Sequence, residues 1–308
     1  MNKIGRVIKS TGSWYLVRVG DQDVQARLRG KFKQDNLKLT NPIAVGDYVE
    51  LAQEQNQPTA VIVAIQPRKN YIIRKSTRKT NFSHILASNI DQAFLIITLR
   101  SPRTSLGFID RFLVSTESFR IPTTLVVNKI DLVEKENDLD FLQDIKEIYE
   151  PLGYPVLTVS ATEDEDIEGG FKVLLQGKTT LFSGHSGVGK STLLNRLVPH
   201  ANQTTQEVSF ATTKGVHTTT FAEMFDYDGG FIIDTPGIKE FGILGIEDHE
   251  LSHYFVELRQ YLGQCKYNNC RHINEPGCVV LEKLEEGYIH PYRYDSYVRI
   301  LNEEDSYR

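Results

Sequence analysis

The chain has 308 residues, of which 40% are hydrophobic and 24% are charged, as in an ordinary soluble protein with two or three domains. No apolar run is long enough to span a bilayer, and the first residues lack the apolar core of a signal peptide. These features exclude integral membrane and secreted proteins, and they predict a cytoplasmic protein that does not bind membranes.

The charge is unevenly distributed along the chain. Residues 1–80 contain 15 Lys/Arg and 6 Asp/Glu, whereas residues 81–308 contain 20 and 34. A basic N-terminal region followed by an acidic remainder of the chain favours a polyanionic partner that binds one side of the protein.

Short alternating segments begin the chain, with turn residues between them. They predict five strands, at 5–10, 14–19, 24–29, 47–51 and 60–65. Five strands in so few residues predict an oligonucleotide-binding (OB-fold) β-barrel over residues 1–67. Basic residues interleaved with aromatics suit contact with RNA or DNA, and the alternative is a solvated face over core aromatics. The residues concerned are Arg18, Arg27, Arg29, Lys31, Lys33, Lys38, Trp14, Tyr15 and Phe32.

Residues 68–89 are predicted to form a basic linker. Its first part, residues 68–80, contains six basic residues and no acidic one. It either extends the basic surface of the barrel or serves as a flexible tether.

From residue 90 to residue 242, apolar strands alternate with helical stretches. This alternation predicts an α/β domain with a mainly parallel sheet, helices on both faces, and a ligand site outside the carboxyl ends of the strands. The predicted strands are 92–98, 123–127, 155–159 and 179–183, and the predicted helices are 106–119, 139–149, 167–175 and 192–197.

A phosphate-loop motif lies between an apolar strand and a helix, which is the context that this motif requires. Its glycines let backbone N–H groups surround phosphate oxygens, while Lys190 reaches the β- and γ-phosphates and Ser191 binds Mg²⁺. A chance glycine-rich turn is the alternative. The predicted nucleotide-binding residues here are Gly184, His185, Ser186, Gly187, Val188, Gly189, Lys190, Ser191 and Thr192.

The sequence Asn128-Lys129-Ile130-Asp131 follows a predicted strand directly. A carboxylate there can accept from N1–H and the exocyclic amine of guanine, whereas adenine presents an acceptor at N1. Asp131 therefore predicts guanine selection, with Asn128 bracing the loop and the stem of Lys129 covering the base. Ser160 and Ala161 end another strand and are typical of the loop that contacts the base in guanine-binding proteins.

The segment Phe231-Ile-Ile-Asp-Thr-Pro-Gly237 places a carboxylate at a strand end and a glycine three residues later. We expect Asp234 to lie beside the Mg²⁺ shell and the Gly237 N–H to lie beside the γ-phosphate. Either Thr218 or Thr219 is expected to complete the Mg²⁺ shell. Together these motifs predict a site for GTP or GDP with Mg²⁺.

Three cysteines and one histidine form a cluster near the C-terminus. The spacing Cys-x4-Cys-x-His-x5-Cys predicts a closed structural Zn²⁺ site, and unbound buried thiols are the alternative. We expect one zinc ion in a mainly helical module over residues 243–308, with helices at 248–262, 279–286 and 293–302. The predicted ligands are Cys265, Cys270, His272 and Cys278.

The base-binding motifs precede the phosphate loop, which reverses the order in Ras-like GTPases. A circular permutation explains this order. With the basic barrel, the sequence Gly-x-His-Thr-Thr-Thr at 215–220 and the cysteine cluster, the whole chain resembles the circularly permuted bacterial family known as ribosome small-subunit-dependent GTPase A (YjeQ/RsgA). The resemblance implies an OB-fold barrel, a central P-loop GTPase and a C-terminal zinc module. It also implies slow GTP hydrolysis stimulated by the small ribosomal subunit during late maturation.

Ras-type enzymes orient the attacking water with a glutamine just after the position of Gly237, where this chain has Ile238 and Lys239. His217 is the nearest polar candidate, and the resemblance also points to it. The alternative is a loop histidine that makes only local hydrogen bonds. The predicted catalytic residues are thus His217, Lys190 and Gly237.

Three functions are compatible with these motifs. The preferred one is a monomeric GTPase that binds the small (30S) ribosomal subunit and its 16S rRNA and hydrolyses GTP during subunit maturation. The second is a guanine-nucleotide regulatory switch that acts on a protein partner without rRNA. A third, a P-loop transferase or nuclease, lacks any further acid/base or catalytic-metal set in the sequence.

Overall fold

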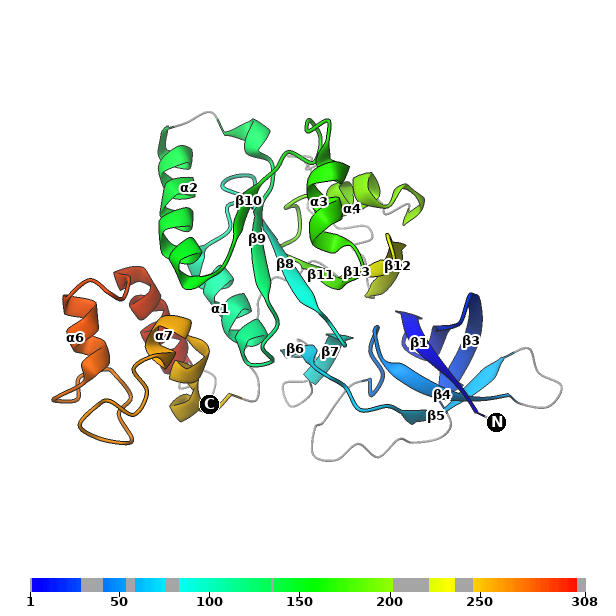
Figure 1. Cartoon of the computed structure of the whole chain (residues 1–308), viewed down its shortest axis with the longest axis horizontal. Helices are drawn as coiled ribbons and strands as arrows, with labels where there is room; N and C mark the ends of the chain where they lie inside the picture. The colour runs from blue at the N-terminus through cyan, green and yellow to red at the C-terminus, as the bar shows by residue number, and fades with distance from the viewer. Residues whose placement is uncertain are drawn as a thin grey trace, which may run out of the picture.

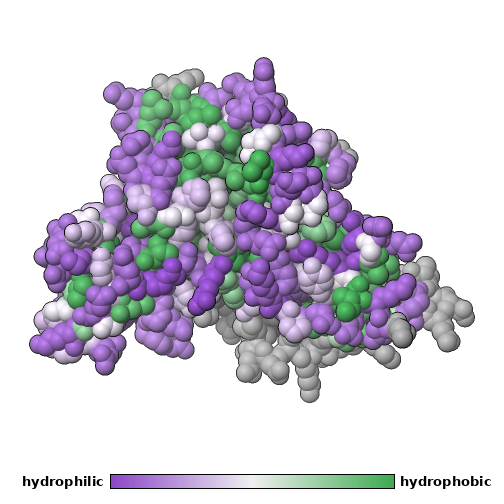
Figure 2. Space-filling model, viewed as in Figure 1, coloured by the Kyte–Doolittle hydropathy of each residue, from purple (hydrophilic) through white to green (hydrophobic). Residues whose placement is uncertain are grey.

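The computed structural model describes residues 2–28, 41–53, 59–75, 83–133, 136–201, 222–235 and 246–303. A β-barrel lies on one side of a central α/β domain, and a helical C-terminal module lies on the other (Figure 1). Hydrophilic residues cover most of the face shown in Figure 2, with small hydrophobic areas on all three parts. Within the ranges given, the helices are too short or too polar to cross a bilayer.

The predicted five-stranded barrel is confirmed. Antiparallel pairs join β1 to β2, β2 to β3, β4 to β5 and β1 to β4, and a parallel pair joins β3 to β5, so the strands close in the order β1-β2-β3-β5-β4. The strand bounds are β1 Lys3–Ser10, β2 Trp14–Val19, β3 Gln22–Leu28, β4 Tyr48–Gln53 and β5 Ala60–Ile65.

The barrel has its own apolar core. The burial of each aromatic residue shows whether it belongs to this core or lies on the surface, where it can contact nucleic acid. Tyr15 is 2% exposed and packs in this core with Val17 and Ile62, while its hydroxyl donates to Asn41 Oδ1 at 2.7 Å. Trp14, in contrast, is 46% exposed. Of the other residues proposed for nucleic-acid contact, Arg27 lies exposed on β3, and Arg29, Lys31, Phe32, Lys33 and Lys38 lie outside the described residues.

The barrel and the central domain share one continuous sheet. Strand β1 pairs antiparallel with β12, with Lys9 opposite Glu223, and the Lys9 ammonium lies 2.8 Å from the Glu223 carboxylate. Arg18 pairs with Asp23 in the barrel and with Asp226 on β12, at 3.0 Å. Arg18 therefore contributes to the domain junction, and its charge is neutralised by two carboxylates.

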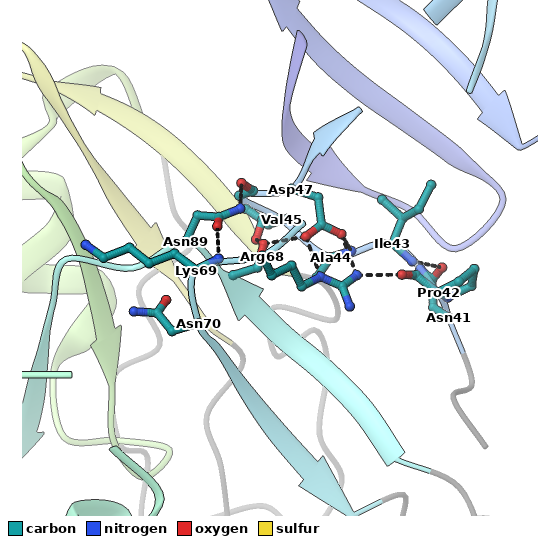
Figure 3. A network of polar contacts seen from close by, with 12 residues as sticks. Asn41, Pro42, Ile43, Ala44, Val45, Asp47, Arg68, Lys69, Asn70 and Asn89 are labelled. Carbon is teal, nitrogen blue, oxygen red and sulfur yellow. Dashed lines mark hydrogen bonds and ion pairs between the residues drawn. The ribbon is translucent and has the colours of Figure 1, made fainter. Parts of the chain in front are cut away.

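The segment predicted as a linker contains a two-stranded antiparallel sheet, formed by β6 (Tyr71–Lys75) and β7 (Ser83–Ser88). Its start is anchored to the barrel (Figure 3): Arg68 donates to both carboxylate oxygens of Asp47, each at 2.7 Å, and to Pro42 O at 2.7 Å. At its end, Asn89 Nδ2 donates to Gly46 O at 3.0 Å. In its described part this connection is structured at both ends. The boundaries of the predicted domains stay a prediction.

The central domain has the mainly parallel sheet that the sequence predicts. The strand order is β10-β9-β8-β11-β13-β12, parallel throughout except for β12, which pairs antiparallel with β13 and joins this sheet to β1 of the barrel. Strand β12 was not predicted. The bounds are β8 Gln92–Ile97, β9 Thr123–Val127, β10 Val156–Thr158, β11 Thr179–Ser183, β12 Glu223–Tyr227 and β13 Gly230–Asp234.

Helices cover both faces of this sheet, as predicted. Alternate residues of β8 point to opposite sides: Leu95 and Ile97 pack with α1 and α2, whereas Phe94 and Ile96 pack with α3 and α4. This alternation follows from the two-residue period of a strand. The helices are α1 Leu106–Glu117, α2 Glu136–Tyr149, α3 Ile167–Leu175 and α4 Lys190–Leu197, with 3-10 turns η1 Ile130–Leu132, η2 Glu150–Leu152 and η3 Pro199–Ala201.

The C-terminal module packs against α1 through an apolar cluster that includes Val114 of that helix. The predicted single helix over 248–262 is wrong: the segment forms a 3-10 helix, η4, and a short α-helix, α5. The break lies at Phe255, whose extended backbone (φ −98°, ψ 107°) directs a fully buried ring into the cluster. The bounds are η4 Asp248–Tyr254, α5 Val256–Arg259, α6 Val279–Glu285 and α7 Pro291–Glu303.

Candidate nucleotide and metal sites

The phosphate loop connects the end of β11 to the start of α4, and two of its glycines are sterically required. A Cβ on Gly184 would lie 2.2 Å from Ile96 O, and a Cβ on Gly189 would lie 2.3 Å from Asn128 Nδ2. Gly189 also has φ +91°, a conformation that side chains rarely adopt. The loop can therefore follow this path only with glycine at both positions.

Lys190, the first residue of α4, lies inside the phosphate loop. It is 8% exposed, and its ammonium donates to Gly184 O and to His185 O, each at 2.8 Å. The half-buried His185 ring stacks on Phe108 of α1 at a centroid distance of 3.6 Å. The remaining predicted residues of the loop are the exposed Ser186 and Gly187, the buried Val188, and the half-buried Ser191 and Thr192.

Asn128 joins the phosphate loop to both base-binding motifs. Its side-chain amide donates to Val188 O at 2.8 Å, and its oxygen accepts from the Ala161 N–H at 3.0 Å. The Ser160 hydroxyl donates to Asp131 Oδ1 at 2.6 Å, which orients that carboxylate. Residues that are far apart in the sequence are thereby brought to one end of the parallel sheet.

Lys129 connects the base-binding loop to a segment that sequence reasoning missed. It has left-handed backbone (φ 60°), and its ammonium donates to Ser101 O at 2.8 Å. Burial lowers the pKa of Lys129, while Asp131 opposes the decrease. Neither Ser101 nor Phe108 belongs to a recognisable motif, so no signal in the sequence marks them as neighbours of the site.

The end of β13 adds a buried carboxylate to this edge. Asp234 is 2% exposed, and its Oδ1 makes no hydrogen bond in the described part of the chain. Burial raises the pKa of Asp234 to about 6, and the Lys190 ammonium opposes the increase. Burial likewise lowers the pKa of Lys190 to about 8, with Asp234 opposing. A buried carboxylate oxygen without a partner fits a Mg²⁺ ion or its water shell.

Four predicted site residues, His217, Thr218, Thr219 and Gly237, lie outside the described residues. Their roles in hydrolysis and Mg²⁺ binding stay predictions.

The predicted metal ligands Cys265, Cys270, His272 and Cys278 converge, with all four ligand atoms within 4.8 Å of one another. Cys265 Sγ lies 3.9 Å from Cys278 Sγ, and His272 Nδ1 lies 3.6 and 3.4 Å from these two sulfur atoms. Ligand atoms about 2.0–2.3 Å from a tetrahedral ion are about 3.3–3.8 Å apart, so the cluster can hold a metal ion. Burial lowers the pKa of His272, which favours the neutral imidazole that binds metals.

Backbone and side-chain contacts hold the metal-binding loop in place. Tyr294 donates to His272 O at 2.9 Å and Tyr297 donates to Arg271 O at 2.7 Å, so α7 supports the loop directly. Although burial acts to raise the pKa of Glu275, N–H donors that include Arg271 and Ile273 lower it to about 2. The carboxylate therefore stays ionised and holds the turn at residues 271–275 by accepting from the backbone N–H groups of Arg271, Ile273 and Asn274.

Comparisons with known proteins agree with this arrangement. The family model of the RsgA GTPase matches residues 65–244, and that of the RsgA N-terminal domain matches residues 4–62. The chain belongs to the RsgA GTPase family. It is therefore a GTPase, an enzyme that hydrolyses GTP to GDP and phosphate.

Relatives and solved structures match along nearly the whole chain. The small ribosomal subunit biogenesis GTPase RsgA of Cytophaga hutchinsonii is 50% identical over 307 residues, 99% of each chain. A protein of the same name from Bacteroides fragilis is 48% identical over 308 residues, covering 99% of this chain and 98% of the relative. The structure of YjeQ from Thermotoga maritima has a TM-score of 0.74 and 34% identity and covers 98% of both chains. YloQ, described as a circularly permuted GTPase, has a TM-score of 0.73 and 31% identity and covers 100% of this chain and 96% of its own.

Proposed function

We propose that this GTPase binds the small ribosomal subunit and its rRNA and hydrolyses GTP to assist late subunit maturation. The main support is the near full-length match, at 50% identity, to a protein named as a small ribosomal subunit biogenesis GTPase. The basic N-terminal region supports an RNA partner independently, because Lys and Arg that neutralise phosphates contribute most of the affinity for nucleic acid.

In this proposal the nucleotide occupies the sheet edge between the phosphate loop and Asp131. Asp131 accepts from guanine, and Lys190 moves from the carbonyl groups of its loop to the β- and γ-phosphates. Ser191, Asp234 and either Thr218 or Thr219 would hold a Mg²⁺ ion, which would supply charge stabilisation at the phosphates. His217 orients the attacking water, and the Gly237 N–H contacts the γ-phosphate.

The cysteine cluster is proposed to hold one structural zinc ion. Three thiolates and an imidazole prefer zinc over hard cations, and a closed set of four ligands leaves no open position for catalysis. The chain is proposed to act as a monomer with the domains 1–67, 68–89, 90–242 and 243–308.

We further propose that the state of the γ-phosphate is transmitted to the C-terminal module through residues 234–242. Helix α1 offers a second connection, because its Phe108 stacks on His185 while its Asp110 pairs with Arg293 of α7. Hydrogen exchange of residues 246–303 in the GTP-analogue and GDP forms, free and on the subunit, tests this coupling. Identical exchange in all forms would require the coupling to be abandoned.

The alternative function is a guanine-nucleotide switch that acts on a protein partner. In that case the positive charge of the barrel has no role in the function. GTP hydrolysis measured with and without isolated small subunits separates the two functions. We expect a large stimulation that decreases steeply between about 50 and 200 mM salt, because phosphate contacts release counterions. Hydrolysis that ignores the subunit at every salt concentration would favour the alternative.

A further inference from the structure

Arg196 lies in the last turn of α4, the helix that begins with the phosphate-loop residue Lys190. Its guanidinium donates to two carbonyl groups outside its own helix: Nη2 to Asp164 O at 2.6 Å and Nη1 to Ala161 O at 3.3 Å. These contacts connect the phosphate-binding helix to the loop at residues 160–164. The sequence motifs assign no role to Arg196.

The loop at residues 160–164 is closed on itself and attached to the base-binding motif. The Asp164 carboxylate accepts from the Ser160 N–H at 2.7 Å, and Asp164 N donates back to Ser160 O at 3.0 Å. The Ser160 hydroxyl donates to Asp131. These contacts do not use the carbonyl groups of Ala161 and Asp164. Arg196 donates to both of these groups, so it restrains the loop from the side of α4.

The orientation of Ala161 is therefore restrained at both of its peptide planes. Its N–H lies 3.0 Å from Asn128 Oδ1, and its carbonyl oxygen accepts from Arg196. A backbone N–H can pair with O6 of guanine, which is an acceptor, but not with the N6 amine of adenine, which is a donor. An N–H at this edge can share its hydrogen between Asn128 and O6 in a three-centre bond.

We propose that Arg196 is a positioning residue for guanine recognition, which holds the Ala161 peptide where its N–H meets O6 of the base. This inference rests on the guanine-nucleotide site proposed above. Asp131 reads N1–H and the exocyclic amine, whereas the loop held by Arg196 reads O6, so the two act on different atoms of the base.

Three nucleotides separate these contributions. GDP and IDP both carry O6, IDP lacks the exocyclic amine, and ADP carries an amine at position 6. Dissociation constants for the three are measured by competition with a fluorescent GDP, for the wild type, Arg196→Met and Arg196→Lys. Lys172→Met on the neighbouring helix α3 is the matched control, because Lys172 pairs only loosely with Asp228, at 4.0 Å. Urea unfolding of each variant reports stability.

For Arg196→Met we expect the dissociation constants of GDP and IDP to rise together by about tenfold, as for the loss of hydrogen bonds to a charged donor. The dissociation constant for ADP stays unchanged. The ratio of the ADP to the GDP dissociation constant therefore falls by about the same factor. Arg196→Lys, with a single donor group, lies between the wild type and Arg196→Met. Lys172→Met matches the wild type.

Two results would overturn the inference: constants for GDP and IDP within twofold of the wild type, or an equal loss for ADP. The second result would show that Arg196 only supports the fold of the phosphate-binding helix. A wild-type protein that did not prefer GDP over ADP would instead contradict the proposed guanine site itself.

Discussion

Arg293 of the C-terminal module and Asp110 of helix α1 form a buried ion pair at 2.5 Å, with each side chain 1% exposed. Arg293 also donates to Glu257 on α5, at 2.6 Å through Nε. Asp110 accepts in addition from Tyr149 at 2.7 Å. One guanidinium therefore satisfies two carboxylates at the boundary between the GTPase domain and the module.

Removal of this guanidinium is expected to destabilise the protein strongly. Arg293→Met leaves two buried carboxylates without a counter-charge, at a cost of about 3–5 kcal/mol in the free energy of unfolding. Arg259→Met is the control, because Arg259 crosses the same boundary to Glu117 but its side chain is 47% exposed, and its loss costs less than about 1 kcal/mol. Urea unfolding measures both. Equal effects of the two substitutions would contradict the role given to burial.

Asn128 is expected to be essential for nucleotide binding. In Asn128→Asp a carboxylate oxygen faces Val188 O, so a hydrogen bond becomes a repulsion and the dissociation constant for GDP rises at least about tenfold. Asn70→Asp is the matched control, since Asn70 also bonds a backbone carbonyl and an N–H, both of Ile90 and both at 2.8 Å. Calorimetric titration with GDP should detect the loss only in Asn128→Asp, whereas both variants lose stability. Weaker GDP binding by Asn70→Asp as well would point to a general folding defect.

Asp234 is expected to reduce the stability of the nucleotide-free protein at neutral and alkaline pH. Its folded-state pKa of about 6 lies above the unfolded value of about 3.9, so the ionised form is destabilising, and this cost disappears as the pH falls through 6 toward 4. At pH 8 the free energy of unfolding of Asp234→Asn, measured with urea, should therefore exceed that of the wild type by up to about 3 kcal/mol. This difference should narrow toward pH 5. The same variant should lose Mg²⁺-dependent nucleotide affinity. A difference in the free energy of unfolding between the two proteins that does not change with pH would contradict the raised pKa of Asp234.

The C-terminal module is expected to depend on its metal ion. Cys270→Ser removes one ligand, so the bound metal falls below one ion per chain and the module loses several kcal/mol of stability. Asn269→Ala, an exposed neighbour in the same loop, should retain the metal. Elemental analysis and hydrogen exchange of residues 246–303, with and without a chelator, measure both effects. Full protection of the module in the chelated protein would rule out a structural metal.

His217→Ala is expected to abolish most of the subunit-stimulated hydrolysis while GTP binding persists. General-base or water-orienting side chains contribute about 10²–10⁴-fold to such rates. Single-turnover hydrolysis on isolated small subunits, together with a binding assay, separates the two effects. If this variant kept the stimulated rate of the wild type, the catalytic assignment of His217 would be wrong. The alternative, a loop residue that makes only local hydrogen bonds, would then hold.

Local patterns were sufficient to predict most of the fold and the motifs of the site. Strands such as β8 and β9 alternate between two buried faces, and the phosphate loop is bracketed by a strand and a helix, so a few neighbouring residues carry the signal. Strand β12 and the β6–β7 pair were missed. Each of these strands has a partner nearby in the chain: β12 pairs along its length with β13 across the turn at Asp228 and Gly229, and β6 pairs with β7. The Asp-Gly turn before β13 is a hairpin signal that indicates β12.

The sequence by itself determined the class of ligand, because the chemistry of guanine and phosphate requires particular residue types at short spacings, as at Asn128–Asp131 and Gly184–Ser191. It also predicted, through their spacing, the four residues that the structure brings together in the cysteine cluster. Only the tertiary structure decided which side chains connect these motifs. Arg196 binds a loop more than thirty residues away, and Arg293 reaches Asp110 across 183 residues. Such contacts depend on where the packed elements lie in space, and no local pattern in the chain encodes that.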